Sequence, residues 1–139
     1  MATGLDGVRE FFEAFERNSN ALDAEALAGQ FGDHFLGADP ARATPVSRAD
    51  FLDALPARRE LFDSAGLLRT RLTSLTETAL DADHVLAETT WVGELRGGDE
   101  LPLGSSFILR RQGASWVVIF YLNHQDITRI LEERVAASS

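Results

Sequence analysis

Asp39 is the residue of this sequence with the clearest potential for acid–base chemistry. It follows the short run His34–Ala38 and precedes Pro40. A carboxylate at the end of a strand can point into a cavity between helices and a sheet, where it could act as a general base. An aspartate that caps a turn before proline is the alternative. The sequence leaves both interpretations open.

The three histidines, His34, His84 and His124, are not spaced like metal ligands on one helix. The chain has no cysteine, which excludes the usual cysteine-bearing zinc sites. We therefore expect no metal site and no cofactor. His84 falls in a predicted turn, where we expect it to be exposed to solvent. For His124 a capping or packing role is favoured over a catalytic one.

Two further groups of polar residues could belong to a site. Arg69, Arg71 and Glu77 share one face of a predicted strand, either as an inward polar cluster or as solvated, salt-bridged residues, which is the favoured interpretation. Tyr121 is the only tyrosine. Strict alternation places it beside Val117 and Ile119, on the sheet face opposite Trp116, Val118 and Phe120.

The overall composition excludes several classes of protein. The 139 residues carry 13 arginines, no lysine and 22 acidic residues, for a net charge of −9. Such a surplus of acid disfavours binding to nucleic acid. The longest apolar run, Trp116–Leu122, is far shorter than the roughly 20 residues that span a bilayer. Residues 1–6 do not resemble a signal peptide, so we expect a cytoplasmic protein with no membrane partner. A chain of this length suits one domain, over residues 1–139.

The first half of the chain has helical periodicity. It predicts three segments: a helix from Val8 to Arg17, a short one that Asp23 caps and that runs to Phe31, and one that begins after Ser47 and ends at Gly66. Pro56 should kink or restart the last of these. Residues 34–38 should be extended, and residues 41–46 should form a loop between Pro40 and Pro45.

From Leu67 onward the period of the apolar residues changes from 3.6 to 2. Strands are expected from Leu67, over 85–96, over 103–111 and over 116–122, followed by a final helix over 127–136. Gly97-Gly98 is typical of a hairpin turn. Helices followed by an antiparallel meander indicate an α+β fold.

The strand Trp116–Leu122 is apolar on both of its faces. Both faces must therefore be covered, and helices of the same chain can cover only one of them. A second subunit is the economical cover for the other face, which predicts a homodimer.

The order of these elements, together with the segments Phe31–Pro40 and Trp116–His124, resembles the nuclear transport factor 2-like superfamily. That superfamily includes ketosteroid isomerases, scytalone dehydratase and SnoaL-like polyketide cyclases. The resemblance covers nearly the whole chain. It implies a cystatin-like cone, in which a curved sheet wraps the helices around an apolar pocket, and dimers that form through the outer sheet face.

The resemblance also implies roles for single residues. Asp39 falls on the catalytic base of the isomerases. Their oxyanion-hole tyrosine falls on Phe15, and their protonated aspartate falls near Ser105, just before Phe107, so both strong donors are missing and steroid isomerisation is not expected. Besides Asp39 as the catalytic residue, the expected ligand-binding residues are Phe15, Trp91, Ser105, Phe107 and Tyr121.

Two classes of function follow from the resemblance. In the first, the protein is an enzyme or a binder of a neutral, largely apolar small molecule, with proton-transfer chemistry of the isomerase, cyclase or dehydratase type. In the second, it is a non-catalytic homodimeric scaffold or interaction module. Polar groups that converge on an apolar cavity favour the first class, and a collapsed cavity favours the second.

Overall fold

The computed structural model describes residues 5–138 and combines five helices with one six-stranded sheet. The helices are α1 (Val8–Ala21), α2 (Ala24–Ala28), α3 (Arg48–Asp53), α4 (Leu55–Ala65) and α5 (Ile127–Ser138). The strands are β1 (Phe31–Asp39), β2 (Arg42–Ser47), β3 (Leu67–Ala79), β4 (His84–Leu95), β5 (Glu100–Gln112) and β6 (Ser115–Asn123). The predicted α+β class and the short C-terminal helix are confirmed.

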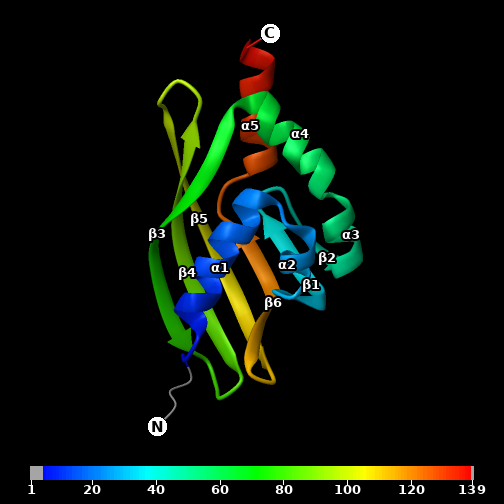
Figure 1. Cartoon of the computed structure of the whole chain (residues 1–139), viewed down its shortest axis with the longest axis vertical. Coiled ribbons are helices and arrows are strands. Elements are labelled where there is room, and N and C mark those ends of the chain that lie inside the picture. The colour runs from blue at the N-terminus through cyan, green and yellow to red at the C-terminus, as the bar shows by residue number, and fades with distance from the viewer. Residues whose placement is uncertain (1–4, 139) are drawn as a thin grey trace.

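The strand order is β2-β1-β6-β5-β4-β3. All neighbouring strands are antiparallel except β1 and β6, which are parallel. Figure 1 shows a curved sheet with α1 lying across β3, β4 and β5, and with α3 and α4 beyond the β1 side. The helices therefore lie on the inner face, and no helix formed by residues 5–138 covers the outer face.

The core forms between α1 and the inner face of the sheet. Phe12 and Phe15 of α1 are buried, and their rings lie 5.0 and 5.4 Å from the ring of Phe107 on β5. Phe15 also lies 6.2 Å from the ring of Trp91 on β4. The apolar stripe of α1 that the sequence predicts thus packs across two central strands.

The third predicted helix restarts at the expected place. α3 ends at Asp53, and α4 begins at Leu55 with Pro56 in its first turn. Proline is tolerated there because the first-turn N–H groups have no partner within the helix. The Ser47 side chain accepts a hydrogen bond from the Asp50 N–H, so the predicted cap of α3 is confirmed.

Several predicted boundaries were wrong. The first helix continues past Arg17 and ends at Ala21. The second helix ends at Ala28, and Phe31 instead begins β1. Residues 41–46 were expected to form a loop, but residues 42–47 form strand β2, which pairs with β1 in a hairpin. β2 lies at the edge of the sheet, where Pro45 costs no central hydrogen bond, so the proline signal was misleading.

Bulges overturn the expected alternation on β6. Between the β5–β6 pairs Leu109–Val118 and Ile108–Phe120, one residue of β6 has no partner. The strand therefore changes faces, and Tyr121 lies on the inner face with Trp116 and Val118, while Phe120 lies on the outer face. The prediction that Tyr121 lies on the sheet face opposite Trp116 and Val118 was wrong for this reason.

Bulges on β3 likewise separate residues that were expected to share a face. The register shifts near Leu68 and Thr73. As a result Glu77, paired with the buried Ala87, does not lie on the face of Arg71. Arg69 and Arg71 instead form exposed ion pairs with Glu94 and Glu100, which confirms the salt-bridged interpretation for the two arginines.

Candidate functional site

An apolar cavity lies between α1, α4 and the inner face of the sheet. We call it the inner cavity, and its volume is about 120 Å³. Its walls are mainly aromatic and aliphatic side chains: Phe15 of α1, Leu27 of α2, Phe51 of α3, Leu55 of α4, Trp91 of β4 and Leu103 of β5. Four of the predicted ligand-binding residues, Phe15, Trp91, Ser105 and Tyr121, line this cavity.

Three polar side chains meet in the wall of the inner cavity, where β5 pairs with β6. Ser105 pairs with Asn123 across the two strands, and its hydroxyl donates a hydrogen bond to Asn123 Oδ1 at 3.0 Å. The side chains of Asn123 and Ser105 also lie close enough to the Tyr121 hydroxyl to lower its pKa. We call Ser105, Tyr121 and Asn123 the polar triad.

A buried chain of hydrogen bonds fixes the strand that carries Ser105. Trp91 Nε1 donates to Thr89 Oγ1 at 2.7 Å, and Thr89 Oγ1 donates to the Ser105 carbonyl at 2.9 Å. All three residues are buried. The groups of this chain are mutually satisfied, so the polar triad sits on a rigid support.

Burial raises the pKa of the Tyr121 hydroxyl. The positive charge of Arg58 and the polar side chains of Asn123 and Ser105 lower this pKa, but burial is the largest cause. The phenol is therefore neutral at neutral pH and can donate a hydrogen bond to an oxygen atom of a ligand.

Because Tyr121 is the only tyrosine, its ionisation can be followed directly by phenolate absorbance. We expect a midpoint above the ordinary value of 10.0 in the folded protein, and a return to that value in denaturant. Between these two pKa values the unfolded chain has lost the proton that the folded chain keeps, so stability should fall as the pH rises through this range. Arg58→Gln should move the folded midpoint higher still. A folded midpoint at or below the ordinary value would contradict the burial of this hydroxyl.

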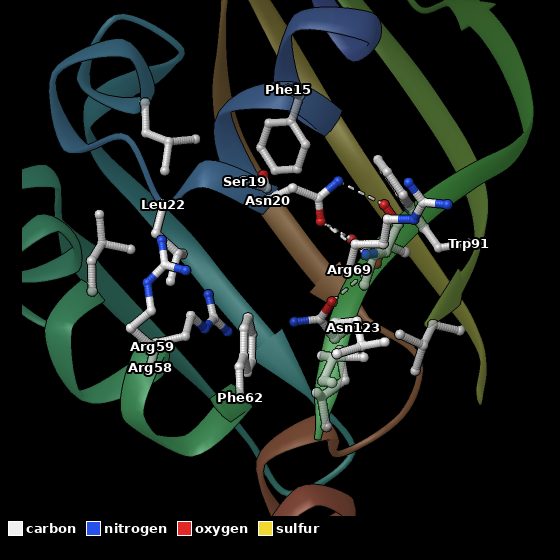
Figure 2. Close-up of a pocket in the computed structure, with 18 of the residues that line it drawn as sticks. Phe15, Ser19, Asn20, Leu22, Arg58, Arg59, Phe62, Arg69, Trp91 and Asn123 are labelled. Carbon is white, nitrogen blue, oxygen red and sulfur yellow. Dashed lines mark hydrogen bonds between the residues drawn. The ribbon is translucent and has the colours of Figure 1, made fainter. Parts of the chain in front are cut away.

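Three arginines line the inner cavity: Arg58 and Arg59 of α4, and Arg69 of β3. Arg59 donates to the carbonyl of Ala21 at 2.6 Å, and Arg69 pairs with Glu94. Figure 2 shows Arg58 and Arg59 extending from α4 on one side of the cavity, with Asn123 of β6 facing them across it. Polar groups thus approach the cavity from two directions.

A larger and more open cleft adjoins the inner cavity. We call it the outer cleft, and its volume is about 560 Å³. Arg58, Phe62, Tyr121 and Asn123 are among the residues that line both spaces. A ligand larger than the inner cavity can therefore extend into the cleft while it contacts the polar triad.

Asp39 lies in the wall of the outer cleft and does not line the inner cavity. Its Oδ1 accepts hydrogen bonds from the N–H groups of Ala41 and Arg42, at 2.8 and 3.1 Å, and so closes the turn between β1 and β2. This is the geometry of the turn-capping interpretation. The same side chain remains exposed enough to contact a ligand in the cleft.

Phe107 lines neither space. It is fully buried, and its ring stacks on Tyr121 at 4.5 Å, so it supports the polar triad from behind. His84 bonds the carboxylate of Asp81 in the turn before β4, and His124 bonds Ser106 on the protein surface. Within residues 5–138 there is no group of three or more His, Asp or Glu side chains suited to hold a metal ion.

Sequence reasoning missed Arg58, Asn123 and Phe51 as residues of the site. Asn123 carried a usable signal, because it ends the apolar strand on which Tyr121 also lies. Arg58 and Phe51 carried none, because their approach to the cavity depends on how α3 and α4 pack against the sheet.

Residues 6–126 match the family described as NTF2-like protein (DUF6841). The chain belongs to this NTF2-like family. The match covers helices α1 to α4 and every strand of the sheet, and it ends just before α5. No curated protein matches the sequence.

Solved structures share the NTF2-like fold. An NTF2-like protein with a cystatin-like fold from Novosphingobium aromaticivorans is 20% identical, with a TM-score of 0.70 over 91% of this chain and 86% of the other. A cystatin-like protein of unknown function from Nostoc punctiforme is 15% identical, with a TM-score of 0.71 over 89% and 93%. An NTF2-like protein of unknown function from Pseudomonas putida is 17% identical, with a TM-score of 0.70 over 89% and 88%. These likenesses establish the cystatin-like cone.

None of the helices within residues 5–138 is long and apolar enough to cross a lipid bilayer.

Proposed function

We propose that this NTF2-like protein binds a small molecule with a largely apolar body in the inner cavity, and that the polar triad binds an oxygen atom of that molecule. The observation that carries the proposal is the meeting of Ser105, Tyr121 and Asn123 in the wall of an aromatic cavity. Apolar walls with a few convergent polar groups are the usual composition of a small-molecule site.

Proton transfer to or from such a ligand is the enzymatic form of this proposal. The neutral Tyr121 hydroxyl supplies a donor for a developing oxyanion, in place of the donors that are missing at Phe15 and Ser105. Asp39 is the candidate base. It shares the outer cleft with Tyr121, so a substrate that occupies both spaces could contact both side chains.

Filling the inner cavity tests the binding proposal. In Ser105→Leu a branched apolar side chain replaces a buried hydroxyl that bonds Asn123. Against a panel of apolar molecules with a ketone, alcohol, carboxylate or amide end, we expect affinity to fall about tenfold or more, a free-energy loss of roughly 1.4 kcal/mol. Tryptophan fluorescence is a suitable measurement, because Trp91 lines the cavity.

Ser106→Leu is the matched control, since Ser106 is the next residue of β5 and bonds His124 at the surface. We expect it to bind the same molecules as the wild type does. Equal binding by wild type and Ser105→Leu, or no binding by the wild type, would be evidence against the inner cavity as a site.

We further propose that the protein is a homodimer formed through the outer face of the sheet. Four apolar side chains form a continuous row across neighbouring strands of that face: Leu36 of β1, Phe120 of β6, Ile108 of β5 and Leu86 of β4. None of the four is fully buried, and Leu36 is 38% exposed. A second copy can pair the same row with itself across a two-fold axis. A non-catalytic homodimeric module is the alternative function, and this row is the observation that favours it.

A further inference from the structure

We propose that the ligand of the inner cavity carries a carboxylate, and that Arg58 of α4 is the residue that binds this group. The inference rests on the proposed binding function and specifies the chemical class of the ligand: a small organic acid with an apolar body. It replaces the neutral ligand that the sequence suggested.

The environment of Arg58 is the first reason. Its side chain is half-buried, and its guanidinium lies 5.7 Å from the centre of the Phe62 ring. No carboxylate of residues 5–138 lies within ion-pair distance of it. Arg58 lines both the inner cavity and the outer cleft, so its unpaired charge faces the space that a ligand would fill.

The other two arginines of the inner cavity differ from Arg58. Arg59 and Arg69 are exposed to solvent, and each already has a hydrogen-bond or ion-pair partner. Among the described residues, Asp63 is the only acidic one that lines the cavity, and it is also exposed. Because Glu94 neutralises Arg69, the charges left at the cavity are those of Arg58 and Arg59 against the single carboxylate of Asp63, an excess of positive charge in a chain whose net charge is −9.

The cost of removing water from the Arg58 guanidinium indicates which charge the ligand carries. A ligand that fills the cavity removes water from the Arg58 guanidinium. A neutral apolar ligand would leave that charge buried without a partner, which is unfavourable. A carboxylate replaces the lost water with charge-assisted hydrogen bonds, which an arginine can donate in pairs.

The position of the polar triad completes the argument. Arg58 is close enough to Tyr121 for its charge to act on the phenol, and Asn123 faces Arg58 across the cavity in Figure 2. An acid head bound by Arg58 can therefore accept a further hydrogen bond from the Tyr121 hydroxyl. The aromatic walls, with Phe15 and Trp91, then hold the apolar body.

Matched acids and amides test the inference, because a primary amide has nearly the shape of a carboxylate without its charge. The probes are cinnamate against cinnamamide and octanoate against octanamide, measured by calorimetry at neutral pH and low salt. We expect each acid to bind the wild type about tenfold or more tighter than its amide. In Arg58→Gln this preference should disappear, while amide binding stays within about twofold of the wild type.

Arg110→Gln is the control, because it makes the same change of charge at an exposed residue that lines neither the inner cavity nor the outer cleft. It should keep the preference for acids, as should Arg58→Lys in part, since lysine keeps the charge but not the paired donors. Equal binding of acids and amides by the wild type, or a preference that survives Arg58→Gln, would overturn the carboxylate inference and leave the binding proposal intact. If none of the four probes binds the wild type, the carboxylate inference is wrong, and the ketones and alcohols of the panel described above decide the binding proposal separately.

Discussion

Phe107→Ala is expected to lower the free energy of unfolding by about 3–5 kcal/mol. The Phe107 side chain has no exposed surface, and its ring contacts Phe12, Phe15 and Tyr121 at centroid distances of 5.0, 5.4 and 4.5 Å. Truncation removes these contacts and leaves a cavity between α1 and the sheet that rigid neighbours cannot fill. Urea denaturation at one fixed protein concentration measures the loss.

The control for this prediction is Leu80→Ala. Leu80 follows β3 and is 52% exposed, so its truncation should change stability by about 0.5 kcal/mol or less. A loss for Phe107→Ala no larger than that of the control would mean that the ring does not form part of the core. Phe107 would then again be a candidate for ligand binding, because a side chain whose truncation hardly lowers the free energy of unfolding is not needed to fill the core.

Phe120→Arg is expected to convert the proposed homodimer into a monomer. Phe120 pairs with Leu36 on one side and with Ile108 on the other, which places it in the middle of the apolar row on the outer face. In a two-fold interface each substitution acts twice, because the same surface is used by both copies. Two arginines facing each other in a buried apolar interface have no partner, and their desolvation opposes association strongly.

Light scattering at micromolar concentration measures this effect: the molecular mass of the Phe120→Arg variant in solution should be half that of the wild type. The matched control is Leu80→Arg, which places the same charge on an exposed leucine outside the row and should leave the dimer intact. A wild-type mass of one chain, or a Phe120→Arg variant that stays dimeric, would contradict the proposed interface.

Local sequence patterns predicted the elements of the fold well. The change of period at Leu67, the hairpin signal at Gly97-Gly98 and the cap at Ser47 all depend on interactions within a few residues, and each feature occurs at the expected place. The helix restart at Pro56 is of the same kind, because proline acts on its own turn of helix.

Strand β2 and the sheet faces depended on partners that are distant in the sequence. Pro45 is compatible with a strand only because β2 lies at the edge of the sheet, and the order of strands is a property of the whole fold. The bulge on β6 inserts one unpaired residue and so reverses the face of every residue that follows it. No local pattern in residues 116–122 marks that insertion.

The site divides in the same way. The sequence by itself determined which side-chain types are present: a single tyrosine, no cysteine, arginine as the only long basic side chain, and an aromatic stripe on the first helix. Only the tertiary structure decided which of these groups meet. The β6 bulge turned Tyr121 inward to Ser105 and Asn123, and the packing of α4 brought Arg58 to the same cavity, while Asp39 stayed in the wall of the outer cleft. The reason is physical: side-chain type is a local property, whereas burial, pairing and the direction of a side chain are set by elements that come together only when the chain folds.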